Sequence, residues 1–232
     1  MLFRIAAGLL VILAVAAATF TSEGRAQSTV IEKPAAQLRY FSIATGSAVG
    51  TYFPIGTALV SAISNPPGSR TCDRGGSCGV PGLVAVAFTS EGSLANVAAI
   101  ANGAIDSALV QADIVHAAYR GPIQVPGGRG LGQRAAGLRV IANLYPETIH
   151  LVARRGAGIS SVADLPGKRV SVDLAGSGTR LNAQTILAAY GITLAQLIVS
   201  EVDPTETFDL FQRNQLDAFF LVAGYPAAAI TE

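Results

Sequence analysis

The sequence repeats one local arrangement three times: an apolar segment typical of a β-strand, a turn rich in Gly, Ser and Thr, and the start of a helix. The three turns lie at residues 45–52, 89–93 and 174–179. When strands alternate with helices in this way, the strands pair in parallel and the helices cross over the sheet. The repetition therefore predicts an α/β fold with a largely parallel sheet.

Hydrophobic periodicity and turn residues divide the remainder of the chain. Strands are expected at 38–44, 84–88, 107–110, 150–153, 170–173, 197–202 and 218–222, and helices at 53–63, 94–102, 111–119, 180–190 and 205–213. The Gly- and Pro-rich segment 121–137 is expected to be a surface excursion. A second α/β block is expected to begin with residues 138–144.

Composition excludes several classes of protein. The chain has 232 residues, of which 50% are hydrophobic, and its formal net charge is +1. It can therefore bury a sizeable core and does not have the composition of a disordered chain. Because there is no basic surplus, nucleic acid is not an expected partner.

The N-terminal segment is typical of a secretory signal peptide. One positive charge in residues 1–4 precedes an apolar run at 5–20 and a polar stretch at 21–27. This order predicts export, with cleavage near Ala26 or Gln27 and a periplasmic location. An uncleaved membrane anchor is the alternative, although a spanning helix needs about 20 apolar residues and this run is shorter.

The cysteine content agrees with export. Cys72 and Cys78 are the two cysteines of the chain, and Gly75 and Gly76 lie between them. In an oxidising compartment this pair is expected to form a disulfide, which stabilises by about 2 kcal/mol in the chain-entropy model. Two thiolates without a nearby histidine do not fill a zinc site, so no metal is expected.

The three turns have the chemistry of an anion site. A helix start offers unpaired backbone N–H groups and partial positive charge, and glycine lets a ligand approach them. Turns at the ends of parallel strands converge on the crevice where open α/β sheets bind ligands. The expected ligand is a small carboxylate. Ordinary N-capping by Ser and Thr remains the alternative for each turn taken singly.

An enzymatic function has less support in the sequence. No nucleotide-binding loop and no G-x-S-x-G elbow is present, so neither a cofactor nor a catalytic residue is predicted. His116 and His150 are the only histidines. An exported serine hydrolase or transferase remains an alternative, and it requires one of them within hydrogen-bond reach of a loop serine.

An ordered set of motifs resembles the TAXI solute receptors of TRAP transporters. The motifs are IATGSAVGTYFPIG at 43–56, TSEGSLAN at 89–96, GAIDSALVQAD at 103–113, LYPE at 144–147, DLPGK at 164–168, GSGT at 176–179 and QLDAFFLVAGYP at 215–226. The resemblance covers nearly everything from Leu38 to Pro226.

The resemblance implies a monomeric, two-lobed periplasmic-binding-protein-like receptor. It closes on a small carboxylate, such as glutamate or 2-oxoglutarate, and delivers it to the membrane subunit of a TRAP transporter. The implied lobes are residues 28–137 and 138–223, with 224–232 beginning a return to the first lobe. The implied ligand-binding residues are Thr45, Gly46, Ser47, Gly50, Thr51, Tyr52, Ser90, Ser93, Asn96, Gln111, Tyr145, Ser177, Gly178 and Thr179.

The sequence departs from the family pattern in two respects. The loop around Cys72 and Cys78 and the segment 121–137 are not part of the motif pattern. Family members also continue past the position of Pro226, so a first lobe truncated at its C-terminal end is expected. An ABC-type or sensor-linked binding protein of similar architecture is the remaining alternative.

Overall fold

The computed structural model describes residues 37–69, 78–124, 130–227 and 230. The predicted signal peptide at 1–27 lies outside these residues, as does Cys72. Both the leader and the disulfide therefore stay predictions. Within the described ranges, no helix is long and apolar enough to cross a membrane.

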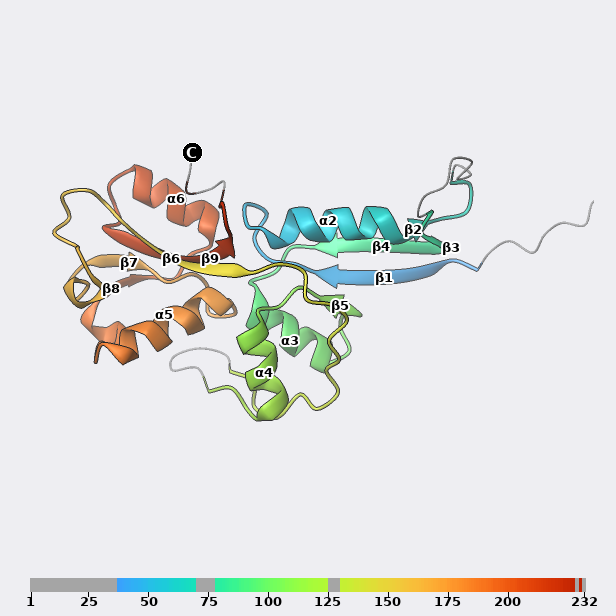
Figure 1. Ribbon diagram of the computed structural model, residues 1–232, viewed down its shortest axis with the longest axis horizontal. Helices are drawn as coiled ribbons and strands as arrows, with labels where there is room; N and C mark the ends of the chain where they lie inside the picture. Colours follow the sequence, from blue (N-terminus) through green and yellow to red (C-terminus); the bar gives the residue numbers. More distant parts are fainter. Residues whose placement is uncertain (1–36, 70–77, 125–129, 228–229, 231–232) are drawn as a thin grey trace, which may run out of the picture. The chain divides into compact units, whose positions relative to one another are not determined.

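The first lobe is built around a three-stranded parallel sheet with the strand order β4-β1-β5 (Figure 1). Its elements are β1 (Arg39–Ala44), α2 (Tyr52–Ile63), β2 (Ser64–Asn65), β3 (Val80–Pro81), β4 (Leu83–Phe88), α3 (Ser93–Ala101), β5 (Ser107–Ala108) and α4 (Ala112–Arg120). Helix α2 packs against β1 and β4. It approaches closely because Gly56 faces Thr45 and Ala87, where a Cβ would collide with the Thr45 methyl group.

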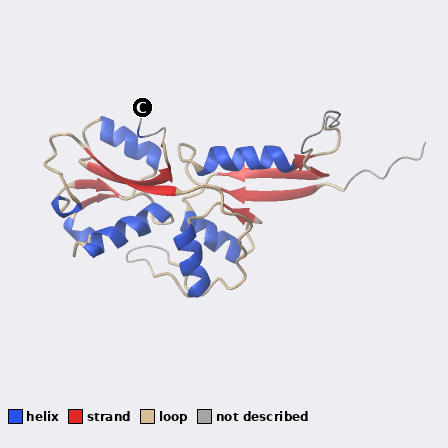
Figure 2. Cartoon of the chain, viewed as in Figure 1, coloured by secondary structure: helices blue, strands red, loops and turns tan. Residues whose placement is uncertain are grey.

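The second lobe contains a four-stranded sheet with the order β6-β9-β7-β8. Strand β6 runs antiparallel to β9, and the other neighbours are parallel. The elements are β6 (Glu147–Ala153), η1 (Val162–Asp164), β7 (Arg169–Ser171), α5 (Gly178–Ala189), η2 (Leu194–Gln196), β8 (Ile198–Ser200), α6 (Pro204–Gln212) and β9 (Ala218–Gly224). Helices α5 and α6 lie on opposite faces of this sheet (Figure 2).

Strand β9 explains why the second sheet is covered on both faces. Its side chains alternate across the sheet, as in any strand. Ala218 and Phe220 enter the core that contains Leu187 of α5. Phe219 and Leu221 enter the core on the α6 side, where Phe208 and Phe211 lie edge-on to Phe219 with ring centroids 5.6 and 5.0 Å away. A strand buried on both faces is a continuous apolar run, as this one is.

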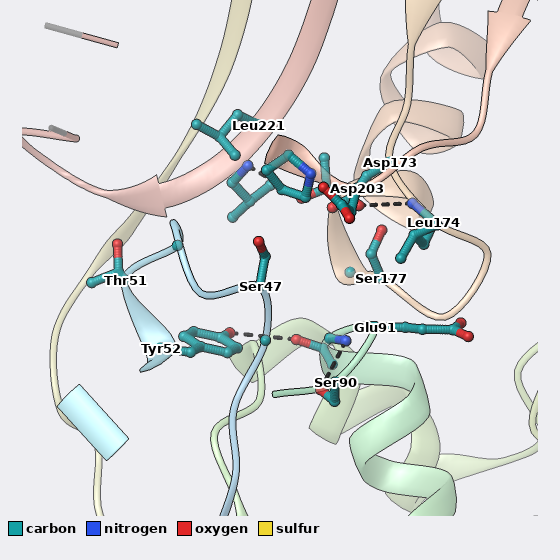
Figure 3. Close-up of a pocket in the computed structure, with 18 of the residues that line it drawn as sticks. Ser47, Thr51, Tyr52, Ser90, Glu91, Asp173, Leu174, Ser177, Asp203 and Leu221 are labelled. Carbon is teal, nitrogen blue, oxygen red and sulfur yellow. Dashed lines mark hydrogen bonds between the residues drawn. The ribbon is translucent and has the colours of Figure 1, made fainter. Parts of the chain in front are cut away.

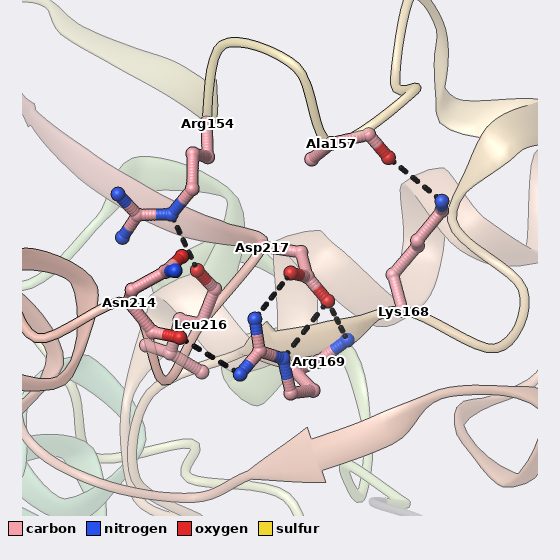
Figure 4. A network of polar contacts seen from close by, with 7 residues as sticks. All are labelled: Arg154, Ala157, Lys168, Arg169, Asn214, Leu216 and Asp217. Atoms are coloured by element: carbon pink, nitrogen blue, oxygen red, sulfur yellow. Dashed lines mark hydrogen bonds and ion pairs between the residues drawn. The ribbon is translucent and has the colours of Figure 1, made fainter.

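A polar network joins the starts of β7 and β9 (Figure 4). Arg169 pairs with Asp217 through Nη2–Oδ1 and Nε–Oδ2 distances of 2.6 and 3.1 Å, and its Nη1 donates to the Asn214 carbonyl. The guanidinium lowers the pKa of Asp217 to about 2. Arg154 donates to the Leu216 carbonyl. Since this network lies at the N-terminal ends of both strands, it fixes the sheet and leaves the opposite ends free for a site.

The α/β prediction is confirmed, and every predicted strand and helix named above has a counterpart, with two corrections. Residues 138–144, where the second α/β block was expected to begin, form no strand, and Val140 and Ile141 are exposed. The block begins instead with β6 at Glu147. The segment 121–137 is not simply a surface excursion. Its Ile123, Leu131 and Ala135 are buried in the core of α3 and α4.

Candidate functional site

A cavity of about 480 Å³ opens where the strand-to-helix turns of both lobes meet (Figure 3). The turns after β1, β4 and β5 line it from the first lobe, and those after β7 and β8 from the second. Leu221 and Val222 of β9 complete the wall. The predicted convergence of turns at the carboxyl ends of parallel strands is therefore what the fold produces.

The lining turns present five helix starts to the cavity, and these differ between the lobes. Ser177 caps α5 by accepting from the Arg180 N–H at 3.0 Å, and Asp203 caps α6 by accepting from the Glu206 N–H at 3.0 Å. In contrast, the N-cap residues Thr51, Gly92 and Gln111 of the described helices α2, α3 and α4 make no side-chain cap hydrogen bond. The third N–H of these helices is nevertheless not available, because Pro54 has none and those of Ala95 and Ile114 donate to the Gly176 carbonyl and to Asp113 Oδ1. The first-lobe helices therefore present the N–H groups of their first two residues.

Most of the predicted binding residues line this cavity. They are Gly46, Ser47, Gly50, Thr51, Tyr52, Ser90, Ser93, Gln111, Ser177, Gly178 and Thr179.

Thr45, Asn96 and Tyr145 are not among the lining residues. Thr45 is buried and donates through Oγ1 to the Phe88 carbonyl at 2.7 Å. Asn96 donates to the carbonyls of Thr45 and Leu109 at 2.6 and 2.8 Å. These two side chains hold the first-lobe turns from behind. The Tyr145 ring lies 3.5 Å from where a Cβ on Gly224 would sit.

Four carboxylates that the sequence prediction missed also line the cavity: Glu91, Glu147, Asp173 and Asp203. No lysine, arginine or histidine is among the described lining residues. Each of these carboxylates lies in a turn at a strand end or at the start of a strand. Their positions at strand ends could have indicated that they line the site. Acidic residues at strand ends are, however, usually exposed to solvent, so this signal is weak.

Asp173 is the most deeply buried of the four. Its backbone is left-handed, with φ of 71°, a conformation that Asp tolerates better than most residues. The Leu174 N–H donates to its Oδ1 at 2.7 Å, and the hydroxyls of Ser177 and Thr179 also stabilise the anion. Burial nevertheless raises the pKa of Asp173 to about 6, and the nearby Asp203 charge adds to the shift.

Glu147 is paired across the cavity with the first lobe. The Tyr52 hydroxyl donates to Glu147 Oε2 at 2.8 Å. Burial raises the pKa of Glu147, and the tyrosine hydrogen bond opposes that shift. The pKa of Tyr52 is raised by its own burial and by the Glu147 charge, so the phenol keeps its proton.

Further contacts join the turns of the two lobes. The Gly176 N–H donates to Glu91 Oε2 at 3.1 Å, and the Gly176 carbonyl accepts from the Ala95 N–H at 3.0 Å. A side chain at Gly176 would collide with Glu91 and Ala95, so glycine is required for this approach. Asn182 donates to Asp113 at 2.7 Å farther along the same side. The cavity is thus bounded by lobes that are in direct contact.

Comparison with known families gives one match that covers most of the chain. The NMT1-like family matches residues 43–232. It includes all the predicted binding residues and both sheets apart from the first four residues of β1. The TAXI resemblance is thereby supported only at the level of this broader family.

Solved structures of similar proteins include a protein from Bordetella bronchiseptica RB50, 16% identical, with a TM-score of 0.52 over 82% of this chain and 52% of that one. A second is the alkanesulfonate-binding protein SsuA from Xanthomonas axonopodis pv. citri bound to MOPS, 18% identical, with a TM-score of 0.46 over 83% of this chain and 56% of that one. A third, from Methylobacillus flagellatus KT, is assigned as the periplasmic sulfonate-binding protein of an ABC transporter. It is 16% identical, with a TM-score of 0.41 over 81% of this chain and 52% of that one. The chain spans about half the length of these structures.

Proposed function

This chain belongs to the NMT1-like family, and we propose that it is a periplasmic solute-binding receptor that reversibly holds a small molecule with an anionic group. The observation that carries the proposal is the cavity between the lobes. It is small, and turns from both sheets line it. The N-termini of three helices, none of which has a side-chain cap, also face it. Such N–H groups bind carboxylate, sulfonate or phosphate groups without a cationic side chain.

Binding without chemical turnover is the form of the proposal that the residues support. The alternative of a serine hydrolase requires a histidine near a serine of the cavity. His116 is exposed on α4 and His150 lies within β6, and neither lines the cavity. The serines of the cavity instead hold turns: Ser90 donates to the Thr45 carbonyl and Ser177 caps α5.

The proposal also concerns the type of membrane transporter that the receptor supplies. The ordered motifs favour a TAXI-type TRAP transporter, which an ion gradient drives. Among the similar proteins described above, the transporter that is named is of the ABC type, which ATP drives. The ABC-type reading fits these comparisons at least as well as the TRAP reading. Uptake assays separate them, because ligand accumulation in receptor-supplied membrane vesicles will depend either on an imposed ion gradient or on ATP.

A thermal-shift screen of amino acids, dicarboxylates and sulfonates on the purified chain tests the receptor proposal. A ligand at 100 times its Kd stabilises the folded state by about 2.7 kcal/mol. We expect at least one compound to raise the melting temperature and to be recovered unchanged after incubation. A compound recovered chemically altered would contradict the receptor function and favour the hydrolase alternative.

A further inference from the structure

The cavity has two chemically different sides. On the first-lobe side, helices α2 and α3 begin without side-chain caps, and Ser47 adds a hydroxyl. On the second-lobe side, Asp173 and Asp203 lie close together at the cavity (Figure 3). The other lining carboxylates, Glu91 and Glu147, accept hydrogen bonds from the Gly176 N–H and the Tyr52 hydroxyl. The first side therefore suits an anionic group better than the second, where Asp173 and Asp203 repel one. A ligand that is anionic at both ends, such as a dicarboxylate, therefore fits this cavity poorly.

An unpaired acceptor marks the same place independently of the carboxylates. Gln111, at the start of α4, is 7% exposed and lines the cavity, and its buried Oε1 has no hydrogen-bond partner among the described residues. This oxygen lies against Gly178, in the first turn of α5. The hydroxyls of Ser177 and Thr179, at the same helix start, stabilise the Asp173 carboxylate by hydrogen bonding. A buried acceptor without a donor is costly, so the Gln111 amide is expected to turn toward a donor that a ligand brings into the cavity.

The two aspartates and Gln111 are all acceptors in their observed arrangement, and no cationic side chain of the described lining offsets them. A positively charged nitrogen would donate to Gln111 and neutralise the repulsion between Asp173 and Asp203. We propose that the ligand is a zwitterion, an inference that rests on the receptor function proposed above. Its ammonium group lies beside Asp173, Asp203 and Gln111, and its anionic group lies at the starts of α2 and α3.

The test uses two matched pairs of probes that differ in the amino group. Glutamate is compared with glutarate, and taurine with ethanesulfonate, by calorimetric titration of the purified chain. Because one pair is carboxylate and the other sulfonate, the result does not depend on the anionic group. In at least one pair, the amino compound is expected to bind at least about tenfold more tightly than its partner.

Two variants locate the ammonium. Asp173→Asn removes the charge and keeps a residue that tolerates the left-handed backbone. Asp203→Ser removes the second charge and keeps a side chain that caps α6. Either change is expected to reduce the preference for the amino compound by about tenfold. Asp209→Asn, which removes a charge from α6 outside this cavity, is the control and should leave the preference unchanged.

The outcomes separate this inference from the receptor function. Equal or tighter binding of glutarate and ethanesulfonate would overturn the zwitterion and leave the receptor intact. An amino preference that survives in both aspartate variants would also overturn it. If none of the four probes binds, the zwitterion is overturned, and the thermal-shift screen decides the receptor proposal separately.

Discussion

The two larger sheets of this chain consist of similar apolar strands, yet they differ in how much of their surface is covered. In the second lobe, α5 and α6 cover opposite faces, and Phe219 of the internal strand β9 is 3% exposed. In the first lobe, Tyr40, Val86 and Phe88 lie on one face of the sheet, and Tyr40 and Phe88 are 72% and 49% exposed. The second lobe should therefore contribute most of the stability, and the first lobe should tolerate changes on its open face.

Truncating one phenylalanine in each sheet tests this difference with the largest expected effect. Phe219→Ala removes a ring that contacts Phe208 and Phe211 in a closed core, and it should lower the free energy of unfolding by about 3–5 kcal/mol. Phe88→Ala removes a ring that is half exposed, and it should cost about 1 kcal/mol or less. Denaturant titrations of both variants measure the difference. Equal losses would show that the open face of the first sheet is covered in solution.

The second lobe should also respond to pH through Asp173. Its pKa of about 6 is above the ordinary value, so between roughly pH 4 and 6 the folded state holds a proton that the unfolded state has lost. Stability should therefore fall as pH rises through this range. Burial is the main cause of the shift, which corresponds to about 2–3 kcal/mol, and the charge of Asp203, from the start of α6, adds to it.

The matched variant for this pH effect is Asp173→Asn, because the amide cannot ionise. Thermal melts from pH 4 to 7.5 should show a smaller decline for the variant than for the wild type, and the variant should be the more stable of the two near pH 7. Identical pH profiles for both proteins would mean that Asp173 is well solvated in the folded state. The same comparison distinguishes Asp173 from Glu147, whose raised pKa acts in the same direction.

The sequence predicted the elements of both lobes well, because continuous apolar runs such as the one in β9 and glycine-rich turns such as 45–52 are local signals. It could not predict which faces are covered, since that depends on contacts between distant segments. Val140 and Ile141 illustrate this point: the second α/β block was expected to begin at 138–144, but both side chains are exposed and no described strand pairs with them. Burial is a tertiary property that composition does not contain.

The same limit applies to the candidate site. Gly, Ser and Thr in the turns pointed correctly to the cavity wall, because their positions at strand ends are fixed by topology. Thr45 and Asn96 have the same donor groups as their neighbours, yet both point into the protein and bind carbonyls there. Asp173 was missed because its burial and its proximity to Asp203 arise only when β7 and β8 are adjacent.

The smallest expected effect concerns the ion pair between Arg169 and Asp217, which fixes β7 to β9 in the second lobe. Asp217→Asn should cost about 1 kcal/mol at neutral pH, since the Arg169 side chain is 38% exposed and water screens the pair. The pKa of Asp217 is lowered to about 2, so this contribution is present above pH 4 and disappears as pH falls toward 2. Asp209→Asn, in a more exposed pair with Arg213, is the control and should change stability by less.

The central claim is that the cavity between the lobes binds the ligand, and two neighbouring residues test it most directly. Ala48 is exposed and lines the cavity, whereas Val49 is exposed and does not. Tryptophan at either position places the same large side chain there without displacing a buried one. In calorimetric titrations with whichever screened compound binds, Ala48→Trp should abolish one-to-one binding, and Val49→Trp should retain the affinity of the wild type. Undiminished binding by the Ala48→Trp protein, with its fold intact, would contradict the claim.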